Sequence, residues 1–193
     1  MKNLHARWSG RGGFTLLELM VILMIMAVLA YASLQTVPYV MGRVRDTRRI
    51  DSLATMQRAI EIYRADTGVY PATSLVTPPN TYFATDGANA ADLTMGGTTV
   101  TGDYIPGLTP SYYSQLPVDP QPGLSTDPAV CAPLGYHRTI AYISDGINFK
   151  LIYACANEST TILPSDDFAD PGRCLGNCWA WAVSSDTAAT QNW

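Results

Sequence analysis

A single carboxylate stands at the start of a long apolar run, and its position needs a chemical reason. Glu18 lies four residues after Phe14, and the run from Leu19 to Ala32 that follows carries no charge. A charge within bilayer hydrocarbon costs about 2.5–3.5 kcal/mol on insertion scales. Glu18 therefore either lies near a membrane surface and caps the first turn of a helix, where acidic groups are favourable, or pairs with a cation in a buried place.

Residues that would serve an enzyme are few. Only His137 remains as a histidine beyond the N-terminal segment, and it lies in an expected strand beside Arg138. The sequence has no nucleophile elbow, phosphate-binding glycine loop or histidine-rich metal motif. We therefore expect that the protein is not an enzyme. The distant alternative is a membrane-anchored exported hydrolase whose catalytic groups are a pair of carboxylates.

The residues around Glu18 predict a membrane anchor. Residues 14–34 make about 30 Å of helix, which is enough to span the hydrocarbon of a bilayer. A secretory signal places its small-residue cleavage site after the apolar core, whereas here Gly12-Gly13 precedes it. The positive-inside rule places the start of the chain in the cytoplasm and the rest outside, because three basic residues and no acid precede the glycines: Lys2, Arg7 and Arg11.

The run Gly12-Gly13-Phe14-Thr15-Leu16-Leu17-Glu18, with its basic leader and apolar sequel, resembles the prepilin processing site of type IV pilins and type II secretion pseudopilins. The resemblance implies that a prepilin peptidase cuts between Gly13 and Phe14, so that residues 1–13 are a cleaved cytoplasmic leader and Phe14 becomes the methylated N-terminus. It also implies that Glu18 stays in the core of a filament, paired with the Phe14 amino group of a neighbouring subunit.

Helical periodicity continues beyond the anchor. We expect residues 35–66 to form an amphipathic continuation, so that one helix runs from Phe14 to Asp66 and ends at Thr67-Gly68. Pro38 predicts a kink or a local melt near residues 33–38, because proline removes a helical hydrogen bond. The apolar face of the continuation consists of Ile50, Leu53, Met56, Ile60 and Tyr63.

A basic cluster lies just past the proline. Such a cluster is usually a solvated face, but in a filament it would also suit ion pairs between subunits. Exposed ion pairs contribute only about 0–1 kcal/mol each, so their main effect would be to fix the register between neighbouring subunits. The cluster consists of Arg43, Arg45, Arg48 and Arg49, interrupted by Asp46.

Residues 71–130 are rich in Pro, Gly, Thr and Asp and are expected to form loops. The run Asp66-Thr67-Gly68-Val69-Tyr70-Pro71 and the later Tyr112–Pro120 look like the D-x-G-x-Y-P and Y-L-x-x-L-P-x-D-P patterns of the major pseudopilin. In physical terms the prolines fix a loop that wraps the helix, and the tyrosines supply packing area.

The remaining segments predict a small sheet. Two β-forming runs, Gly135–Ile143 and Ile147–Ala154, flank Asp145-Gly146, and Asp-Gly is a strong signal for a two-residue hairpin turn. A third strand is expected at Trp179–Val183. A helix laid across a small antiparallel sheet gives an α+β fold for the exported domain, residues 67–193, which matches the lollipop of the pilins.

All four cysteines lie in the expected exported part, where oxidation is favoured. Four cysteines allow three connectivities. Cys174 and Cys178 are close enough to close a small loop, which leaves Cys131 for Cys155, and we favour this pairing. A four-cysteine zinc site would show two close C-x-x-C pairs instead.

Three aspartates in one loop are candidate ligands for a metal ion. Asp166, Asp167 and Asp170 flank Phe168, and hard oxygen ligands of this kind suit Ca²⁺, which needs six to eight of them. Some pseudopilins bind calcium in a C-terminal loop. An acidic surface turn is the commoner explanation for such a group of aspartates. We therefore expect no cofactor, and Ca²⁺ at these three aspartates is the alternative.

Charge and resemblance together predict a structural subunit. The chain has 12 basic and 16 acidic residues, and three of the basic ones precede Gly13, so bulk charge argues against nucleic-acid binding. We expect a single-pass inner-membrane protein with an exported domain, assembling into a homo-oligomeric filament with other pilins or pseudopilins on an inner-membrane platform. A pseudopilin of a type II secretion system is favoured, and a type IV pilin of a surface fibre for adhesion, motility or DNA uptake is the alternative.

Overall fold

The computed structural model describes residues 13–73, 82–85, 97–99, 103–126, 131, 133, 135–159, 161–174, 177–190 and 193. The chain divides into two compact units, residues 1–40 and residues 41–193. This division differs from the expected boundary after residue 66, because the second part of the long helix packs within the second unit.

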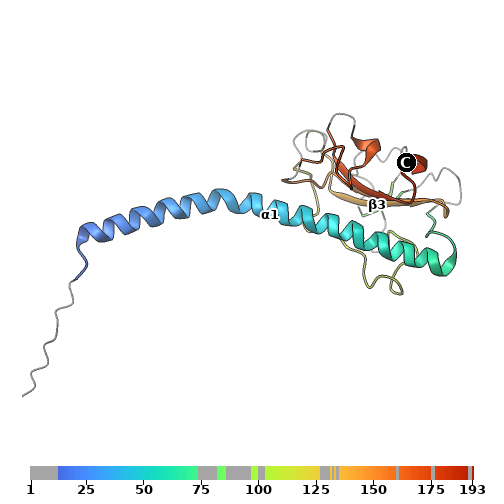
Figure 1. Cartoon of the computed structure of the whole chain (residues 1–193), viewed down its shortest axis with the longest axis horizontal. Helices are drawn as coiled ribbons and strands as arrows, with labels where there is room; N and C mark the ends of the chain where they lie inside the picture. Colours follow the sequence, from blue (N-terminus) through green and yellow to red (C-terminus); the bar gives the residue numbers. More distant parts are fainter. Residues whose placement is uncertain are drawn as a thin grey trace, which may run out of the picture. The chain divides into compact units, whose positions relative to one another are not determined.

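One helix, α1, spans Leu16–Thr67, close to the expected 14–66 (Figure 1). It ends where the sequence indicates: the Gly68 amide donates to the Arg64 carbonyl at 2.8 Å, and Gly68 adopts φ 85°. Glycine reaches this left-handed conformation without the steric cost that a Cβ would add. The local signal at Gly68 therefore sets the residue at which α1 ends.

Pro38 lies inside α1 without melting it. The helix is continuous through residues 33–38, so of the two expected alternatives the structure shows no local melt, and a kink stays a prediction. Two hydroxyls lie in this stretch and donate to helix carbonyls, Ser33 to Leu29 at 2.9 Å and Thr36 to Ser33 at 3.1 Å. A proline costs an interior helix one hydrogen bond, and the remaining helical hydrogen bonds of α1 tolerate that loss.

The second unit contains a five-stranded sheet in the order β2-β1-β3-β4-β5. The β1–β2 pair is parallel and the other three pairs are antiparallel, so the expected antiparallel sheet is confirmed for β3, β4 and β5, and β1 extends it. Two short strands formed where only loops were expected, since three residues carry little periodic signal. The strands are β1 Tyr82–Ala84, β2 Gly97–Thr99, β3 Thr139–Ser144, β4 Phe149–Ala154 and β5 Ala180–Ser184.

The β3–β4 hairpin forms as predicted, but its turn is longer. Ser144 pairs with Phe149, so four residues rather than two connect the strands. The Asp145 carboxylate accepts hydrogen bonds from the amides of Ile147 and Asn148 at 2.9 and 2.7 Å, and Gly146 adopts φ 87°. The Asp side chain thus stabilises a wider turn in place of the tight Asp-Gly turn.

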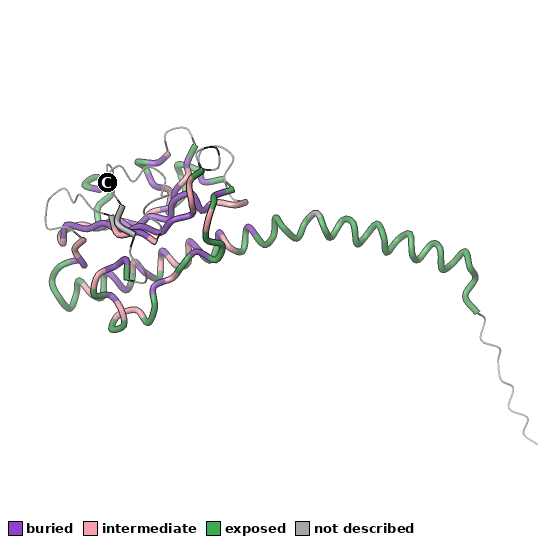
Figure 2. The backbone as a smooth tube through the Cα atoms, turned by 180° about the vertical axis from the view of Figure 1, so that it is seen from behind, coloured by how far each residue is buried: buried purple, intermediate pink, exposed green. Residues whose placement is uncertain are grey.

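The core lies between the second part of α1 and one face of the sheet (Figure 2). Side chains of β3 and β4 alternate between this face and the opposite one, and all of them are buried. Two short elements complete the unit, the 3-10 helix η1 Pro171–Arg173 and α2 Thr187–Thr190. The core side chains are Leu53, Met56 and Ile60 from α1 and Ile140, Tyr142, Phe149, Leu151, Tyr153 and Trp181 from the sheet.

Candidate functional site

The start of α1 holds Glu18 in a reciprocal cap with Thr15. The Glu18 amide donates to Thr15 Oγ1 at 3.2 Å, and the Thr15 amide and hydroxyl donate to Glu18 Oε2 at 3.3 and 3.4 Å. In such a capping box, each side chain satisfies an amide that the first helical turn leaves unpaired. In the single chain Glu18 is therefore a helix cap, and its pairing with a neighbour's amino group stays a prediction.

Gly13 and Phe14 lie in accessible chain just before the helix. The Phe14 side chain is 76% exposed, and no atom lies within 4 Å of the position that a Cβ on Gly13 would take. A peptidase needs its scissile bond outside regular structure, and this bond meets that condition. Residues 1–12 of the expected leader lie outside the described residues.

The first part of α1 presents apolar side chains on all sides. Every side chain described between Leu16 and Val40 is exposed (Figure 2), and Glu18 is the one charged residue of this stretch. Among the described residues, α1 is the one helix long and apolar enough to cross a membrane, judged by length and composition. Because burial gains about 25 cal/mol per Å² of apolar surface, contact of this stretch with lipid or protein is favoured over contact with water.

The arginine cluster past Pro38 divides between surface and core. Arg43 and Arg48 are exposed, Arg45 is half-buried, and Arg49 is fully buried. Arg49 precedes Leu53 by four residues and so lies on the helix face that enters the core. The expectation of a solvated or inter-subunit cluster is therefore wrong for Arg49.

Three carboxylates surround the Arg49 guanidinium. Nε and Nη2 bind the two oxygens of Asp119, each at 2.8 Å, in the bidentate geometry that arginine favours. Nη1 lies 2.9 Å from Asp46, and Nη2 lies 2.6 Å from Glu158. Arg49 thus joins α1 to the loop after Pro117 and to the loop after β4.

Two further arginines complete a buried charge network. Arg45 Nε donates to the Glu158 carboxylate at 3.0 Å, and Arg138 Nε lies 3.9 Å from it. The Asp46 carboxylate also accepts the Ser159 amide at 3.0 Å. We call these groups the charge network; its three cations and three anions balance, and they are Arg45, Arg49, Arg138, Asp46, Asp119 and Glu158.

Pairing within the network favours the charged forms of Arg49 and Glu158. Burial by itself would lower the pKa of Arg49, but hydrogen bonds and charge from Asp119 and Glu158 raise it above its ordinary value. Burial by itself would raise the pKa of Glu158, but hydrogen bonds from Arg45 and Arg49 hold it below its ordinary range. Buried charges of this kind are tolerated only when paired and hydrogen-bonded.

We expect this network to make stability depend on acid pH. The pKa of Glu158 is lower in the folded than in the unfolded chain. Its contribution to the free energy of unfolding is therefore complete above the pKa of the unfolded chain, about 4.3, and is lost as pH falls through the pKa of the folded chain. Denaturant titrations of the detergent-solubilised chain should show the free energy of unfolding falling in this range. Glu158→Gln should reduce this acid-induced loss of unfolding free energy.

The matched control for this titration is Asp51→Asn, which removes an exposed carboxylate from α1. It should change the acid dependence less than Glu158→Gln does. An acid profile of Glu158→Gln parallel to that of the wild type would contradict the role of Glu158.

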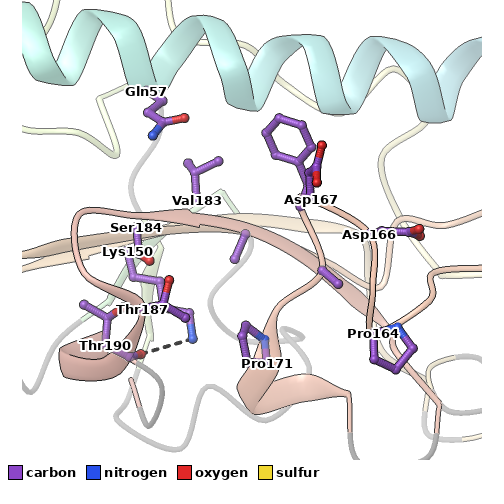
Figure 3. Close-up of a pocket in the computed structure, with 13 residues that line it drawn as sticks. Gln57, Lys150, Pro164, Asp166, Asp167, Pro171, Val183, Ser184, Thr187 and Thr190 are labelled. Atoms are coloured by element: carbon purple, nitrogen blue, oxygen red, sulfur yellow. Dashed lines mark hydrogen bonds between the residues drawn. The ribbon is translucent and has the colours of Figure 1, made fainter.

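A second ion cluster lies beside a pocket of about 430 Å³ (Figure 3). Asp170 binds Lys150 Nζ and Arg173 Nη1, each at 2.8 Å. Lys150 also donates to the carbonyls of Thr190 and Trp193 at 3.2 Å each. The cluster fastens η1 and the last described residues to β4.

The three aspartates of the expected calcium loop differ in burial and in their partners. Asp170 is buried in the ion cluster, whereas Asp166 and Asp167 are exposed at the pocket rim. The Asp166 carboxylate accepts the Leu163 amide at 2.8 Å. In the part of the chain that the structure describes, no three His, Cys, Asp or Glu side chains gather to hold a metal ion; calcium binding stays a prediction without geometric support.

The cysteines form two disulfides, Cys131–Cys155 and Cys174–Cys178. This is the pairing favoured from the spacing. The first ties the loop before β3 to the end of β4, and the second closes a small loop between η1 and β5. An oxidising compartment is the expected place for both.

Sequence reasoning missed the charge network because most of its pairs are distant in the chain. Asp46 and Arg49 stand three residues apart on a helix, which is a local signal for an ion pair. Asp119 is 70 residues from Arg49, and nothing local marks the two as partners. His137, beside Arg138, lies in no cluster of potential metal ligands among the described residues.

Two comparisons with known proteins bear on the site. Residues 8–32 match the family model "Prokaryotic N-terminal methylation motif". The chain is 34% identical over 94 residues to the type II secretion system core protein G of Klebsiella michiganensis, a match that covers 42% of this chain and 64% of that protein. The match thus spans less than two thirds of the relative's length. No solved structure matches the chain.

The fold and the N-terminal site together define a class of protein. A long helix with an exposed apolar start, packed further along on a small, largely antiparallel sheet, is the layout of a pilin-like subunit. In keeping with this layout, the start of the chain matches a methylation motif, and part of the chain is similar to a type II secretion core protein.

Proposed function

We propose that the protein is a structural subunit of a type IV pilus-like filament, assembled through the start of α1. A prepilin peptidase removes residues 1–13 and methylates Phe14. The subunit is then stored in the inner membrane as a single-pass protein with its sheet domain exported. An assembly platform extracts it, and the apolar stretch packs against other subunits. No catalytic activity is part of this proposal.

The exposed apolar stretch that begins within the methylation motif carries the proposal. It reaches from Leu16 to Val40, and no described side chain of the subunit covers it. A surface of this kind suits lipid before assembly and neighbouring helices afterwards. Helices stacked side by side by one repeated contact make an open filament, because such a contact does not close on itself.

Glu18 supplies the specific contact. Cleavage before Phe14 creates an α-amino cation at the end of an otherwise apolar segment. A carboxylate on a neighbouring copy stabilises that cation where water is absent. The capping box keeps Glu18 hydrogen-bonded before assembly, at no net cost to the helix.

Within the family we favour a type II secretion pseudopilin. The supporting observation is the similarity to a type II secretion core protein, over a stretch of 94 residues. The alternative is a type IV pilin of a surface fibre. Neighbouring genes for an outer-membrane secretin and secretion components would support the first, and a gene for a retraction motor would support the second.

We expect the mature protein to begin with N-methyl-phenylalanine at residue 14. Intact-mass and N-terminal peptide mass spectrometry of the chain purified from membranes should find residues 1–13 removed and one methyl group added. Gly13→Leu should block cleavage and leave the precursor mass. A wild-type chain with an intact leader, or with a cut beyond Ala32, would refute the proposed function.

A further inference from the structure

One buried disulfide lies directly before the loop that contacts α1. Cys155 is the first residue after β4, and both Cys155 and its partner Cys131 are fully buried. Glu158, three residues further along, belongs to the charge network. A short stretch of chain therefore joins the disulfide to the charge network.

Cys155 has a backbone conformation that its side chain disfavours. Its φ is 57°, and among the described residues it is the one residue other than glycine with a positive φ. In this left-handed region the Cβ atom comes too close to the following carbonyl oxygen, so that few residues besides glycine, asparagine and aspartate adopt it. Such a conformation persists only where the surrounding structure holds it in place.

Three interactions hold Cys155 in this conformation. Its amide donates to the Trp179 carbonyl at 2.9 Å, and its carbonyl accepts the Ser125 hydroxyl at 2.6 Å. The third is the disulfide to Cys131, whose carbonyl in turn accepts the Tyr136 amide at 3.0 Å. Of the three, the disulfide is the one that a change in redox conditions removes.

The residues after Cys155 bind α1 through both backbone and side chain. The amides of Glu158 and Ser159 donate to the Asp46 carboxylate at 3.2 and 3.0 Å. The Glu158 carboxylate lies 2.6 Å from Arg49 Nη2. These contacts need the loop in one position, because backbone amides and a carboxylate must meet their partners on α1 together.

The fit between this loop and α1 is close. A Cβ placed on Gly42 would lie only 3.3 Å from the Ser159 Cβ. Arg49 has a second distant partner, Asp119, which comes from a different loop. A displaced loop after Cys155 would therefore remove one of the two distant partners of Arg49 and leave the other.

We propose that the Cys131–Cys155 bond is a redox-sensitive latch that holds Glu158 on α1. Forming the bond takes two protons and two electrons from the two thiols, and a thiol–disulfide oxidant accepts them as its own disulfide becomes two thiols. Without the bond, Cys155 relaxes towards a negative φ and Glu158 leaves its arginine partners. The second part of α1 is thus fully fastened only in the oxidised chain. This inference does not depend on the proposed function.

Thermodynamic linkage gives a test that keeps all four cysteines. If the bond favours the ion pairs of Glu158, those ion pairs favour the bond by the same factor. Glu158→Gln should therefore raise the equilibrium constant for reduction of Cys131–Cys155 about tenfold. The detergent-solubilised full-length chain is equilibrated with mixtures of reduced and oxidised dithiothreitol. Free thiols are then trapped with N-ethylmaleimide and counted for each cysteine pair by peptide mass spectrometry.

The Cys174–Cys178 bond is the internal control of this titration, because neither of its cysteines precedes the loop that carries Glu158. A general loss of stability would make both bonds easier to reduce, whereas the latch predicts a change of less than about twofold at Cys174–Cys178. Asp51→Asn, which removes an exposed carboxylate of α1, should shift neither bond. An unchanged constant for Cys131–Cys155, or an equal rise for both bonds, would overturn the latch.

Removing the bond tests the same coupling from the other side. Cys131→Ala with Cys155→Gly breaks the disulfide, while glycine still reaches a positive φ without steric cost. In this background, Glu158→Gln should change the acid dependence of the unfolding free energy about fivefold less than it does in the wild type. Cys174→Ala with Cys178→Ala should keep the full effect. An undiminished effect of Glu158→Gln without the Cys131–Cys155 bond would overturn the latch, and the redox titration decides the question if this variant does not fold.

Discussion

Replacing Glu18 with alanine should leave cleavage after Gly13 intact and abolish filament assembly. Glu18 is the one charge between Leu16 and Val40, so no other side chain of that stretch can receive the Phe14 amino group of a neighbour. Two unit charges 4 Å apart attract by about 4 kcal/mol at an effective dielectric constant of 20. Each 1.4 kcal/mol is about tenfold in an equilibrium constant, and the loss repeats at every subunit. Immunoblots should find processed subunit in the membrane and none in sheared filaments.

Two companion variants separate the charge of Glu18 from its capping role. Glu18→Gln keeps an N3 side chain suited to the capping box but has no charge, so it should fail to assemble as Glu18→Ala does. Thr15→Val removes the hydroxyl that accepts the Glu18 amide, costs the helix about 1 kcal/mol, and should still assemble. The reverse pattern, with Glu18→Gln assembling and Thr15→Val failing, would assign Glu18 to helix capping and remove the pairing from the mechanism.

Arg49→Met should destabilise the folded subunit by about 3–5 kcal/mol, which is the usual loss when one partner of a buried ion pair is removed. The substitution leaves Asp119, Asp46 and Glu158 buried around an apolar side chain. For a chain of this length the melting temperature should fall by roughly 6–20 °C. Thermal unfolding of the detergent-solubilised protein, followed by near-ultraviolet circular dichroism, measures the change.

The control for Arg49→Met is Arg48→Met, one residue earlier and exposed. It should change stability by no more than about 0.5 kcal/mol. Arg49→Lys keeps the charge but cannot bind both Asp119 oxygens in parallel, so it should lie between the two. Equal melting temperatures for Arg48→Met and Arg49→Met would show that the charge network adds nothing to stability.

Features that depend on neighbours in the chain could be predicted from the sequence. The extent of α1 followed from apolar periodicity and from Gly68 at its end. The apolar start with Glu18 indicated both an anchor and a family. The β3–β4 hairpin and the Cys174–Cys178 pair followed from local spacing. Each of these signals lies within a few residues, where secondary-structure propensity and loop closure act.

The tertiary structure alone decided which charges are buried. Arg48 and Arg49 are adjacent in the sequence, yet one is exposed and the other is enclosed by Asp119 and Glu158 from distant loops. Likewise Asp170 differs from Asp167 because it binds Lys150 within the fold. A charge enters a core only where packing brings a partner to offset its lost hydration, and that partner is chosen by the fold rather than by the local sequence.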